Sequence, residues 1–387
     1  MKYAKLLAIT FFIALIVNCA KNDSFRSDNH VVKVINGKKM IINQSVPSIP
    51  NDSLAVNLKL KHKIILADHN LKWSFITRDD EGNIYLTNRD NPAQVFTCKF
   101  DSTGKFITRF GMKGSGPGEI SQFVINSLCF NENLYLSDMW TSVNIYNLEG
   151  DYLREIRYCD LGFDIKSANE LDSTRIIAEI FYREKSESEV YEVRSVCILD
   201  KDLSIKKVLK KVSFPNGYEK GTMNCDELNF KYSYFTYTNN TKNIFIATKN
   251  NNSYYVEVFD NSGNLEYTFS KKFRKLKYGI FEKMLVKKIL KKRDEYSSNL
   301  VKYKNIIKSM DFDKKGRLWI HVNDENGSDM KFDVFDKGVY LNSVELDFKF
   351  EGDYVKYYNL LGFSEKYLFG NQEFLFYNDG EIKVFCY

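Results

Sequence analysis

The chain has 387 residues, a net charge of +6 and an aromatic content of 15%, with 25 Tyr and 30 Phe but only 5 Pro. This composition excludes an intrinsically disordered chain, and it favours a β-rich fold because aromatic side chains suit strands and can fill a large core. By length alone the chain could hold two domains, but all-β folds often extend this far as one.

The N-terminus is typical of an export signal. Lys2 and Lys5 precede a twelve-residue stretch, 6–17, that is apolar apart from Thr10. As a helix this stretch would rise only about 18 Å, whereas a bilayer core is about 30 Å thick. We therefore expect residues 1–18 to be a signal peptide and not a spanning helix.

Leu15-Ile16-Val17-Asn18-Cys19 resembles a lipobox, the cleavage signal of bacterial lipoproteins. The resemblance implies that Cys19 becomes the first mature residue and carries acyl chains such as palmitate, which would hold the protein on a membrane. Asn18 departs from the usual Gly or Ala. Residues 19–30 are then a lipidated tether, and the expected location is the cell envelope, at the outer membrane on its periplasmic or surface side. The alternative is an ordinary secreted protein with an incidental cysteine.

Residues 31–43 have the pattern of a β-hairpin around Asn36-Gly37, a strong two-residue turn signal. A further strand is expected over 58–67.

After this strand one short unit recurs six times: an apolar or aromatic residue, a polar turn containing Asp or Asn, and a new strand. Asp and Asn side chains cap such turns, and Gly accepts the positive φ that they need. The copies are 100–104, 146–150, 199–202, 259–263, 335–338 and 377–380.

A second polar turn precedes each copy, at 80–83, 131–133, 172–174, 240–243, 313–316 and 364–366. Each unit therefore has four strands and two tight turns, the pattern of a propeller blade. We predict an all-β fold, a six-bladed β-propeller of four-stranded antiparallel blades over 31–387. The blades are placed at 73–110, 124–157, 164–210, 230–270, 306–346 and 355–387. The strand 58–67 is expected to join the last blade and close the ring. A two-sheet sandwich is the competing fold.

Phe106-Ile107-Thr108-Arg109-Phe110-Gly111 and Gly114-Ser115-Gly116-Pro117-Gly118-Glu119 resemble the signature of the six-bladed β-propeller lipoproteins, which are distantly similar to NHL-repeat propellers. The resemblance covers nearly all of the expected mature chain. It implies the propeller fold but no defined activity.

In such a blade the two tight turns lie on one face of the ring, and the longer loops lie on the other. Function is expected on the loop-rich face because a rigid scaffold holds varied loops there. Asp138 is expected to bond backbone and hold its blade together. The candidate ligand-binding residues are Glu119, Arg89, Asp90, Trp140, Arg183, His321, Asp324 and Glu373.

The segment 271–305 holds thirteen Lys or Arg against three Asp or Glu, a net charge of +10, so the rest of the chain carries −4. Phe281, Met284, Leu285 and Ile289 recur at helical spacing, which predicts a helical insertion between blades four and five, docked by its apolar face. The segment is either a solvated cover or a basic arm for an anionic glycan, lipid headgroup or protein. The arm residues are Lys283, Lys287, Lys288, Lys291, Lys292 and Arg293. Export argues against a nucleic-acid partner.

Six cysteines follow Cys19 with no C-x-x-C pair, and the four histidines are scattered, so a zinc site of familiar spacing is not expected. Most of these cysteines are expected to be small buried hydrophobic residues. We expect a binding or scaffold protein with no catalytic residues, metal or cofactor. The alternative is a propeller hydrolase or lyase with a metal at the channel mouth, held by oxygens of Asp90, Asp138, Asp324, Glu119 or Glu373.

Overall fold

The computed structural model describes residues 25–26, 29–50, 54, 59–65, 74–88, 95–122, 124–186, 189–215, 234–238, 242–248, 253–280, 282–284, 303–313, 315–323, 330–346, 367–370, 373–378 and 381–386. Cys19, Arg89, Asp90, Asp324 and the arm residues Lys287, Lys288, Lys291, Lys292 and Arg293 lie outside them.

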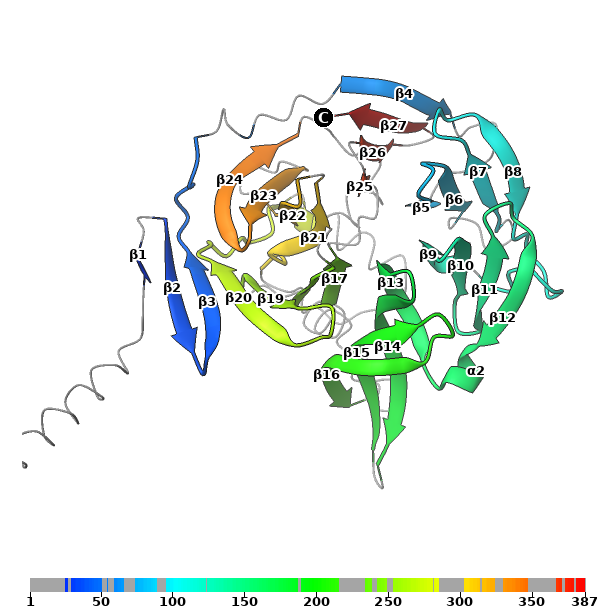
Figure 1. Cartoon of the computed structure of the whole chain (residues 1–387), viewed down its shortest axis with the longest axis horizontal. Helices are drawn as coiled ribbons and strands as arrows, with labels where there is room; N and C mark the ends of the chain where they lie inside the picture. The colour runs from blue at the N-terminus through cyan, green and yellow to red at the C-terminus, as the bar shows by residue number, and fades with distance from the viewer. Residues whose placement is uncertain are drawn as a thin grey trace, which may run out of the picture.

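The strands form six sheets arranged around a central axis (Figure 1). Five of the sheets are four-stranded antiparallel blades, so the predicted all-β propeller architecture is confirmed. Their strands are β5 (Ser74–Arg78), β6 (Ile84–Asn88), β7 (Thr97–Phe100) and β8 (Phe106–Phe110); β9 (Val124–Phe130), β10 (Asn133–Asp138), β11 (Ser142–Asn147) and β12 (Tyr152–Arg157); β13 (Asp164–Asp172), β14 (Arg175–Lys185), β15 (Val190–Asp200) and β16 (Ile205–Pro215); β21 (Ile307–Phe312), β22 (Leu318–Val322), β23 (Lys331–Asp336) and β24 (Val339–Glu345); and β25 (Tyr367–Gly370), β26 (Glu373–Asn378), β27 (Glu381–Cys386) and β4 (Lys59–Ile65).

The sixth sheet differs from the prediction of six separate four-stranded blades, because it has seven strands. The meander β17 (Tyr234–Thr238), β18 (Ile244–Thr248), β19 (Tyr255–Phe259) and β20 (Leu265–Lys271) is extended by β3 (Lys38–Asn43), β2 (His30–Ile35) and β1 (Phe25–Arg26). The reason is that β3 pairs in parallel with the outer strand β20, which would otherwise be an open sheet edge.

The hairpin predicted over 31–43 is confirmed: β2 and β3 are antiparallel, and Asn36 and Gly37 form the turn with φ of 50° and 73°. At its end, Asn43 is fully buried and ties the hairpin to β20 and to the β21–β24 blade. Its amide nitrogen donates to the carbonyls of Ser270 and Gly338, and its amide oxygen accepts the Tyr340 N–H. The N-terminal strands are therefore part of the packed molecule.

The ring is closed by the strand that the sequence assigned to this role. β4 pairs antiparallel with the last strand, β27, although the two are more than 300 residues apart. The innermost strands also contact one another in cyclic order: β5, β9, β13, β17, β21, β25 and back to β5. The last blade is thus completed by a strand that precedes the first blade in the sequence.

Both faces of a blade are buried because each blade stands between two others. In β14, Ile176, Ala178 and Ile180 pack toward β9–β12, whereas Ile177 packs against Ile244 on the other side. Successive strand residues point to opposite faces, so the inner strands carry nearly continuous apolar runs.

Several of the tight turns are organised by a single carboxylate. Asp101, Asp200 and Asp260 each accept the N–H groups of residues i+2 and i+4 at 2.7–3.0 Å. Turns of neighbouring blades are also joined, because Arg175 donates to the carbonyl of Asn261 at 2.9 Å. The predicted capping by Asp is therefore confirmed at these turns. Among the residues that the structure describes, no helix is long and apolar enough to cross a membrane.

Candidate functional site

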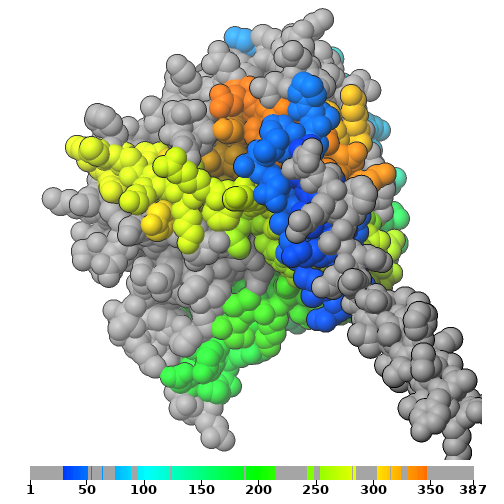
Figure 2. All heavy atoms as spheres, turned by 90° about the vertical axis from the view of Figure 1, so that its left-hand side faces the viewer, coloured from blue at the N-terminus to red at the C-terminus, as the bar shows by residue number. Residues whose placement is uncertain are grey.

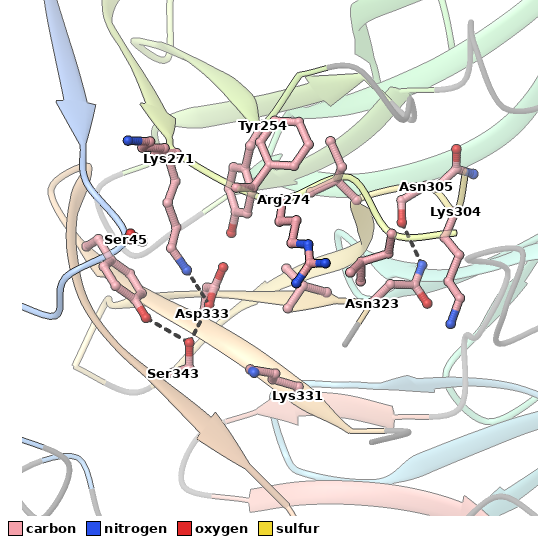
Figure 3. Close-up of a pocket in the computed structure, with 16 residues that line it drawn as sticks. Ser45, Tyr254, Lys271, Arg274, Lys304, Asn305, Asn323, Lys331, Asp333 and Ser343 are labelled. Carbon is pink, nitrogen blue, oxygen red and sulfur yellow. Dashed lines mark hydrogen bonds and ion pairs between the residues drawn. The ribbon is translucent and has the colours of Figure 1, made fainter. Parts of the chain in front are cut away.

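A cavity of about 310 Å³ lies between the seven-stranded sheet and the β21–β24 blade (Figure 3). It is lined at the C-terminal ends of β20 and β22 and at the N-terminal ends of β19 and β23. The carboxylate-capped turns lie at the opposite ends of these strands, so the cavity is on the loop-rich face. Its lining residues are Ser45, Tyr254, Lys271, Lys272, Phe273, Arg274, Leu276, Lys304, Asn305, Ile306, Val322, Asn323, Lys331, Asp333, Tyr340 and Ser343.

The surroundings of the cavity are visible on the face in Figure 2. The blue N-terminal strands run beside the orange β23–β24 region, and the yellow residues that follow β20 spread over the neighbouring surface. Lys272 is held at this junction, because its backbone N–H donates to the carbonyl of Asn43 at 2.9 Å. The extension of the sheet by β3 therefore helps to build this wall of the cavity.

The lining is strongly cationic, with five Lys or Arg side chains and one carboxylate. Two of the cations are neutralised: Lys271 pairs with Asp333 at 2.8 Å, and Lys304 pairs with Glu282 at 2.5 Å. The pair of Lys331 with Glu345 is long, at 3.8 Å, and is partly exposed, so solvent screens it. No carboxylate that the structure describes pairs with Lys272. Among the lining side chains, cations therefore outnumber carboxylates by five to one.

Asp333 is the centre of a buried hydrogen-bond network. Its Oδ1 accepts from Lys271 Nζ at 2.8 Å and from Ser343 Oγ at 2.6 Å, and the Ser343 hydroxyl is 2.7 Å from that of Tyr340 (Figure 3). Lys271 Nζ also lies 3.8 Å from the centre of the Tyr340 ring, which is a favourable place for a cation. Burial lowers the pKa of Lys271 against the opposing charge of Asp333. Burial and the Asp333 charge raise the pKa of Tyr340 to about 12.

Tyr254 contributes a buried hydroxyl beside the Asp333 carboxylate. Its side chain lines the cavity (Figure 3). Burial, and then the charge of Asp333 and a hydrogen bond with it, raise the pKa of Tyr254 well above the usual value. The hydroxyl therefore keeps its proton and belongs to the network around Asp333.

The ends of the basic segment 271–305 form part of the cavity, and its described residues show no clear helical insertion. Residues 272–279 are not helical, and Lys277 forms an isolated bridge with Tyr303. Within 281–289, where the sequence predicts the helix, the described residues 282–284 are helical. Met284, expected on a docked face, is 62% exposed, so the predicted docking is wrong at this position. The ion pair of Lys304 with Glu282 holds the start of the segment against its own end.

The residues predicted from the sequence do not gather at this cavity. Glu119 turns its carboxylate onto its own loop and accepts the Gly116 N–H at 2.7 Å. Trp140 is 67% exposed in the turn between β10 and β11. Arg183 is exposed on β14, and only the backbone of Glu373 in β26 is described. His321 is fully buried in β22, with its ring stacked 5.0 Å from Phe332.

Asp138 has the structural role that the sequence indicated. It is 1% exposed, and its carboxylate accepts the N–H groups of Ser121 and Gln122 at 2.7–3.3 Å. It therefore fixes the glycine-rich loop to β10. Within that loop, Gly118 has a φ of 75°, and an added Cβ would come within 2.8 Å of Tyr152, so close packing explains this glycine.

A second group of buried charges lies on the β13–β16 blade, where Lys166, Glu179, Glu192 and Arg194 are close together. Burial lowers the pKa of Lys166 to about 8. Here two cations face two carboxylates, so the charges balance. The cavity beside Asp333 differs by its excess of cations.

No group of three or more His, Cys, Asp or Glu in the described part of the chain is placed to hold a metal ion. Cys98 and Cys197 are buried, as expected, Cys129 is partly buried, and Cys159 is exposed; all four are free thiols. Burial raises the pKa of both Cys129 and Cys197 to about 12, so these thiols are not activated nucleophiles.

The comparisons with known proteins identify no family. No protein-family model and no curated protein matches the chain. It is similar to the solved WD40 β-propeller domain of Doa1, with 9% identity over 86% of this chain and 97% of that chain and a TM-score of 0.41. It is similar to BamB from Moraxella catarrhalis, with 7% identity over 86% and 98% of the two chains and a TM-score of 0.39. A protein of unknown function from Bacteroides caccae has 12% identity over 72% and 74%, with a TM-score of 0.32. Because these TM-scores are all low, the fold assignment rests on the strand pairing within this chain.

Proposed function

We propose that the protein is an envelope-anchored lipoprotein whose six-bladed propeller is a non-enzymatic binding domain for an anionic ligand. In this proposal the β17–β20 meander counts as the sixth blade, widened by β1–β3. Cys19 carries the lipid anchor. The likeness to the lipoprotein propellers rests on the lipobox and the glycine-rich loop described above.

One observation carries the proposed binding activity: a cavity on the loop-rich face is lined by five cations and one carboxylate, and that carboxylate is already paired. A cavity of about 310 Å³ is at the lower end of the range for small-molecule sites. Low-dielectric walls with charges of one sign concentrate counter-ions in such a cleft. The arrangement therefore favours a small anion, or the anionic group of a larger partner.

The proposal is tested by the melting temperature of the full chain in detergent, measured with increasing inorganic phosphate or acetate at constant ionic strength. A ligand that binds only the folded state raises the melting temperature. We expect such a rise in the wild type and a smaller one in the double variant Lys272→Ala/Arg274→Ala. Lys201→Ala is the matched control, because Lys201 is exposed in the tight turn after β15 on the opposite face of the ring. Equal responses of both variants, or no response of the wild type, would contradict the proposal.

A further inference from the structure

We infer that residues 272–280 and 282–284 form a docking surface for an anionic lipid bilayer. The inference rests on the proposed lipid anchor and adds a second contact with the same membrane. It follows from three features of the docking surface: its exposed positive charge, its exposed apolar side chains and its position relative to the start of β1.

The docking surface carries exposed positive charge. It has five Lys or Arg residues and one carboxylate, Glu282, a net charge of +4. The segment is attached to the propeller through Phe273, which packs against the core, and Tyr278, which is 9% exposed. Its residues, in yellow after β20, lie on the outside of the molecule in Figure 2. All five cations are exposed: Lys272, Arg274, Lys275, Lys277 and Lys283.

Two large apolar side chains are exposed beside these cations. Ile280 is 77% exposed, the highest value for a large hydrophobic residue in the described part of the chain, and Met284 is 62% exposed. Exposed apolar residues next to Lys and Arg are typical of segments that lie in the interface of a bilayer.

The start of the helix directs these two side chains outward. The Glu282 carboxylate accepts the Gly279 N–H at 2.7 Å and pairs with Lys304 at 2.5 Å, so Glu282 marks the attached side of the helical turn. At 3.6 residues per turn, Ile280 and Met284 are both about 160° around the helix from Glu282. They therefore point away from the contact with Lys304.

The proposed anchor is close enough to act on the same bilayer. Phe25 in β1 is in register with Phe269 of β20, across β2 and β3. Three strand spacings amount to about 14 Å. Phe25 comes six residues after Cys19, and six extended residues reach about 20 Å. Because β20 ends at Lys271, directly before the docking surface, a lipid on Cys19 and the docking surface can contact one membrane.

The test is co-flotation of the full chain with phosphatidylcholine vesicles that contain or lack phosphatidylglycerol. The ratio of the two partition coefficients isolates the effect of lipid charge, because acyl chains enter both kinds of vesicle. Each Lys or Arg near an anionic surface strengthens binding about 5-fold. We therefore expect the wild type to prefer the anionic vesicles by about 10-fold or more.

Charge reversal locates this preference. Lys277→Glu/Lys283→Glu should remove most of it, because these two exposed cations lie outside the cavity lining. Lys105→Glu/Lys201→Glu is the matched control: it makes the same change in net charge at exposed positions of two tight turns on the opposite face. The control should keep the wild-type preference.

Substitution of the apolar pair tests insertion into the bilayer. Ile280→Ser/Met284→Ser should lower partition into anionic vesicles about 3-fold or more. The matched control is Leu153→Ser/Val208→Ser, because these residues are 52% and 49% exposed on β12 and β16, away from the docking surface. All four double variants should keep the urea midpoint of the wild type, since the substituted side chains are exposed.

Three outcomes would overturn the inference: equal partition of the wild type into the two kinds of vesicle, equal effects of the two charge variants, or equal effects of the two apolar variants. If poly-L-glutamate binds as tightly as anionic vesicles, and Ile280→Ser/Met284→Ser binds both like the wild type, the surface is a site for an acidic protein. The proposed function is decided separately, by the phosphate response of the melting temperature, in which Lys277 and Lys283 take no part.

Discussion

Asp313 shows how much of this fold is decided by single side chains. Its Oδ1 accepts the N–H groups of Lys315 and Arg317, each at 2.9 Å, and its Oδ2 accepts from the Arg317 guanidinium and the Trp319 indole at 2.6 and 2.9 Å. The carboxylate and Trp319 are both fully buried. The acid is therefore one of the turn caps that the sequence predicts, but its contact with Trp319 becomes visible only in the structure.

Asp313→Ala should lower the free energy of unfolding by about 3 kcal/mol, because it leaves a buried indole N–H and a partly buried guanidinium unpaired. Asp101→Ala is the matched control, since Asp101 caps the same kind of turn in an exposed position. Urea unfolding of both variants measures the difference. Equal losses would show that the buried contacts of Asp313 do not stabilise the blade.

The capping carboxylates also predict how stability responds to acid. Burial raises the pKa of Asp172, but the hydrogen bonds from Arg175 and Thr174 outweigh it and lower the pKa to about 2 from an ordinary value of 3.8. A carboxyl whose pKa is lower in the folded than in the unfolded chain stabilises the fold at pH values above the unfolded-state pKa. For Asp172 this stabilisation is lost as the pH falls from 3.8 toward about 2. The pKa values of Asp101, Asp200 and Asp260 shift in the same direction.

We therefore expect wild-type stability to fall in this acidic window, and Asp172→Asn to fall less steeply because it has no carboxyl to protonate. The difference in unfolding free energy between the two should be largest above the ordinary pKa and should shrink as the pH is lowered, as measured by urea unfolding from neutral pH down to about 3. A difference that stays constant over this range would contradict the assignment.

Only some of the residues that line the cavity could be predicted from the sequence. Lys271, Lys272 and Arg274 stand out in the sequence because the segment is so basic, and Asp138 was assigned its structural role correctly. Tyr254, Asp333 and Ser343 carry no local signal, since each is one polar residue at the edge of an ordinary strand pattern. They become a site only when two neighbouring sheets bring them together around Lys271.

Among the elements, β4 has the largest effect on the topology, because it is the outermost strand of its sheet and β27 is its partner. Successive residues of a strand direct their N–H groups to opposite sides. Lys63 and Ile64 are neighbours in β4 and pair with Lys383 and Ile382 of β27. The backbone N–H of one of them therefore donates to β27, and the N–H of the other points to the open edge of the sheet.

The two substitutions Lys63→Pro and Ile64→Pro form a matched pair. Both place a proline in the same strand, but only one removes a hydrogen bond to β27. We expect their unfolding free energies to differ by about 1 kcal/mol or more, with faster proteolysis of the less stable variant. Two variants that are as stable as the wild type would show that β4 does not close the ring.

The hairpin β2–β3 was predictable from Asn36-Gly37, but its place in the molecule was not. Its parallel pairing with β20 depends on the twist and the free edge of a sheet formed more than 200 residues later. The basic segment shows a related case: its charge is evident from the sequence, and residues 282–284 are helical where the pattern predicts a helix. The exposure of Met284 was not predictable, because it depends on how the segment lies against the propeller.

At the scale of the whole molecule, the proposed lipid anchor decides where the loop-rich face operates. Cys19→Ser should abolish incorporation of labelled palmitate and move the protein from the membrane fraction to the soluble fraction, because a single thiol carries the chains. Cys159→Ser is the control, since Cys159 is an exposed free thiol outside the lipobox and should leave both readouts unchanged. Palmitate incorporation that persists in Cys19→Ser would contradict the anchor.

The sequence by itself determined the repeating unit, the tight turns, the all-β propeller and the strand that closes it. These features are local or periodic: a turn is specified by a few adjacent residues, and a blade by the alternation of turns and apolar strands. The tertiary structure decided the seven-stranded sheet and the cationic cavity. Both depend on which blades become neighbours and on the register between them, as when Lys271 at the end of β20 meets Asp333 on β23. No pattern within either strand encodes that contact, because its free energy depends on burial that exists only after the ring has formed.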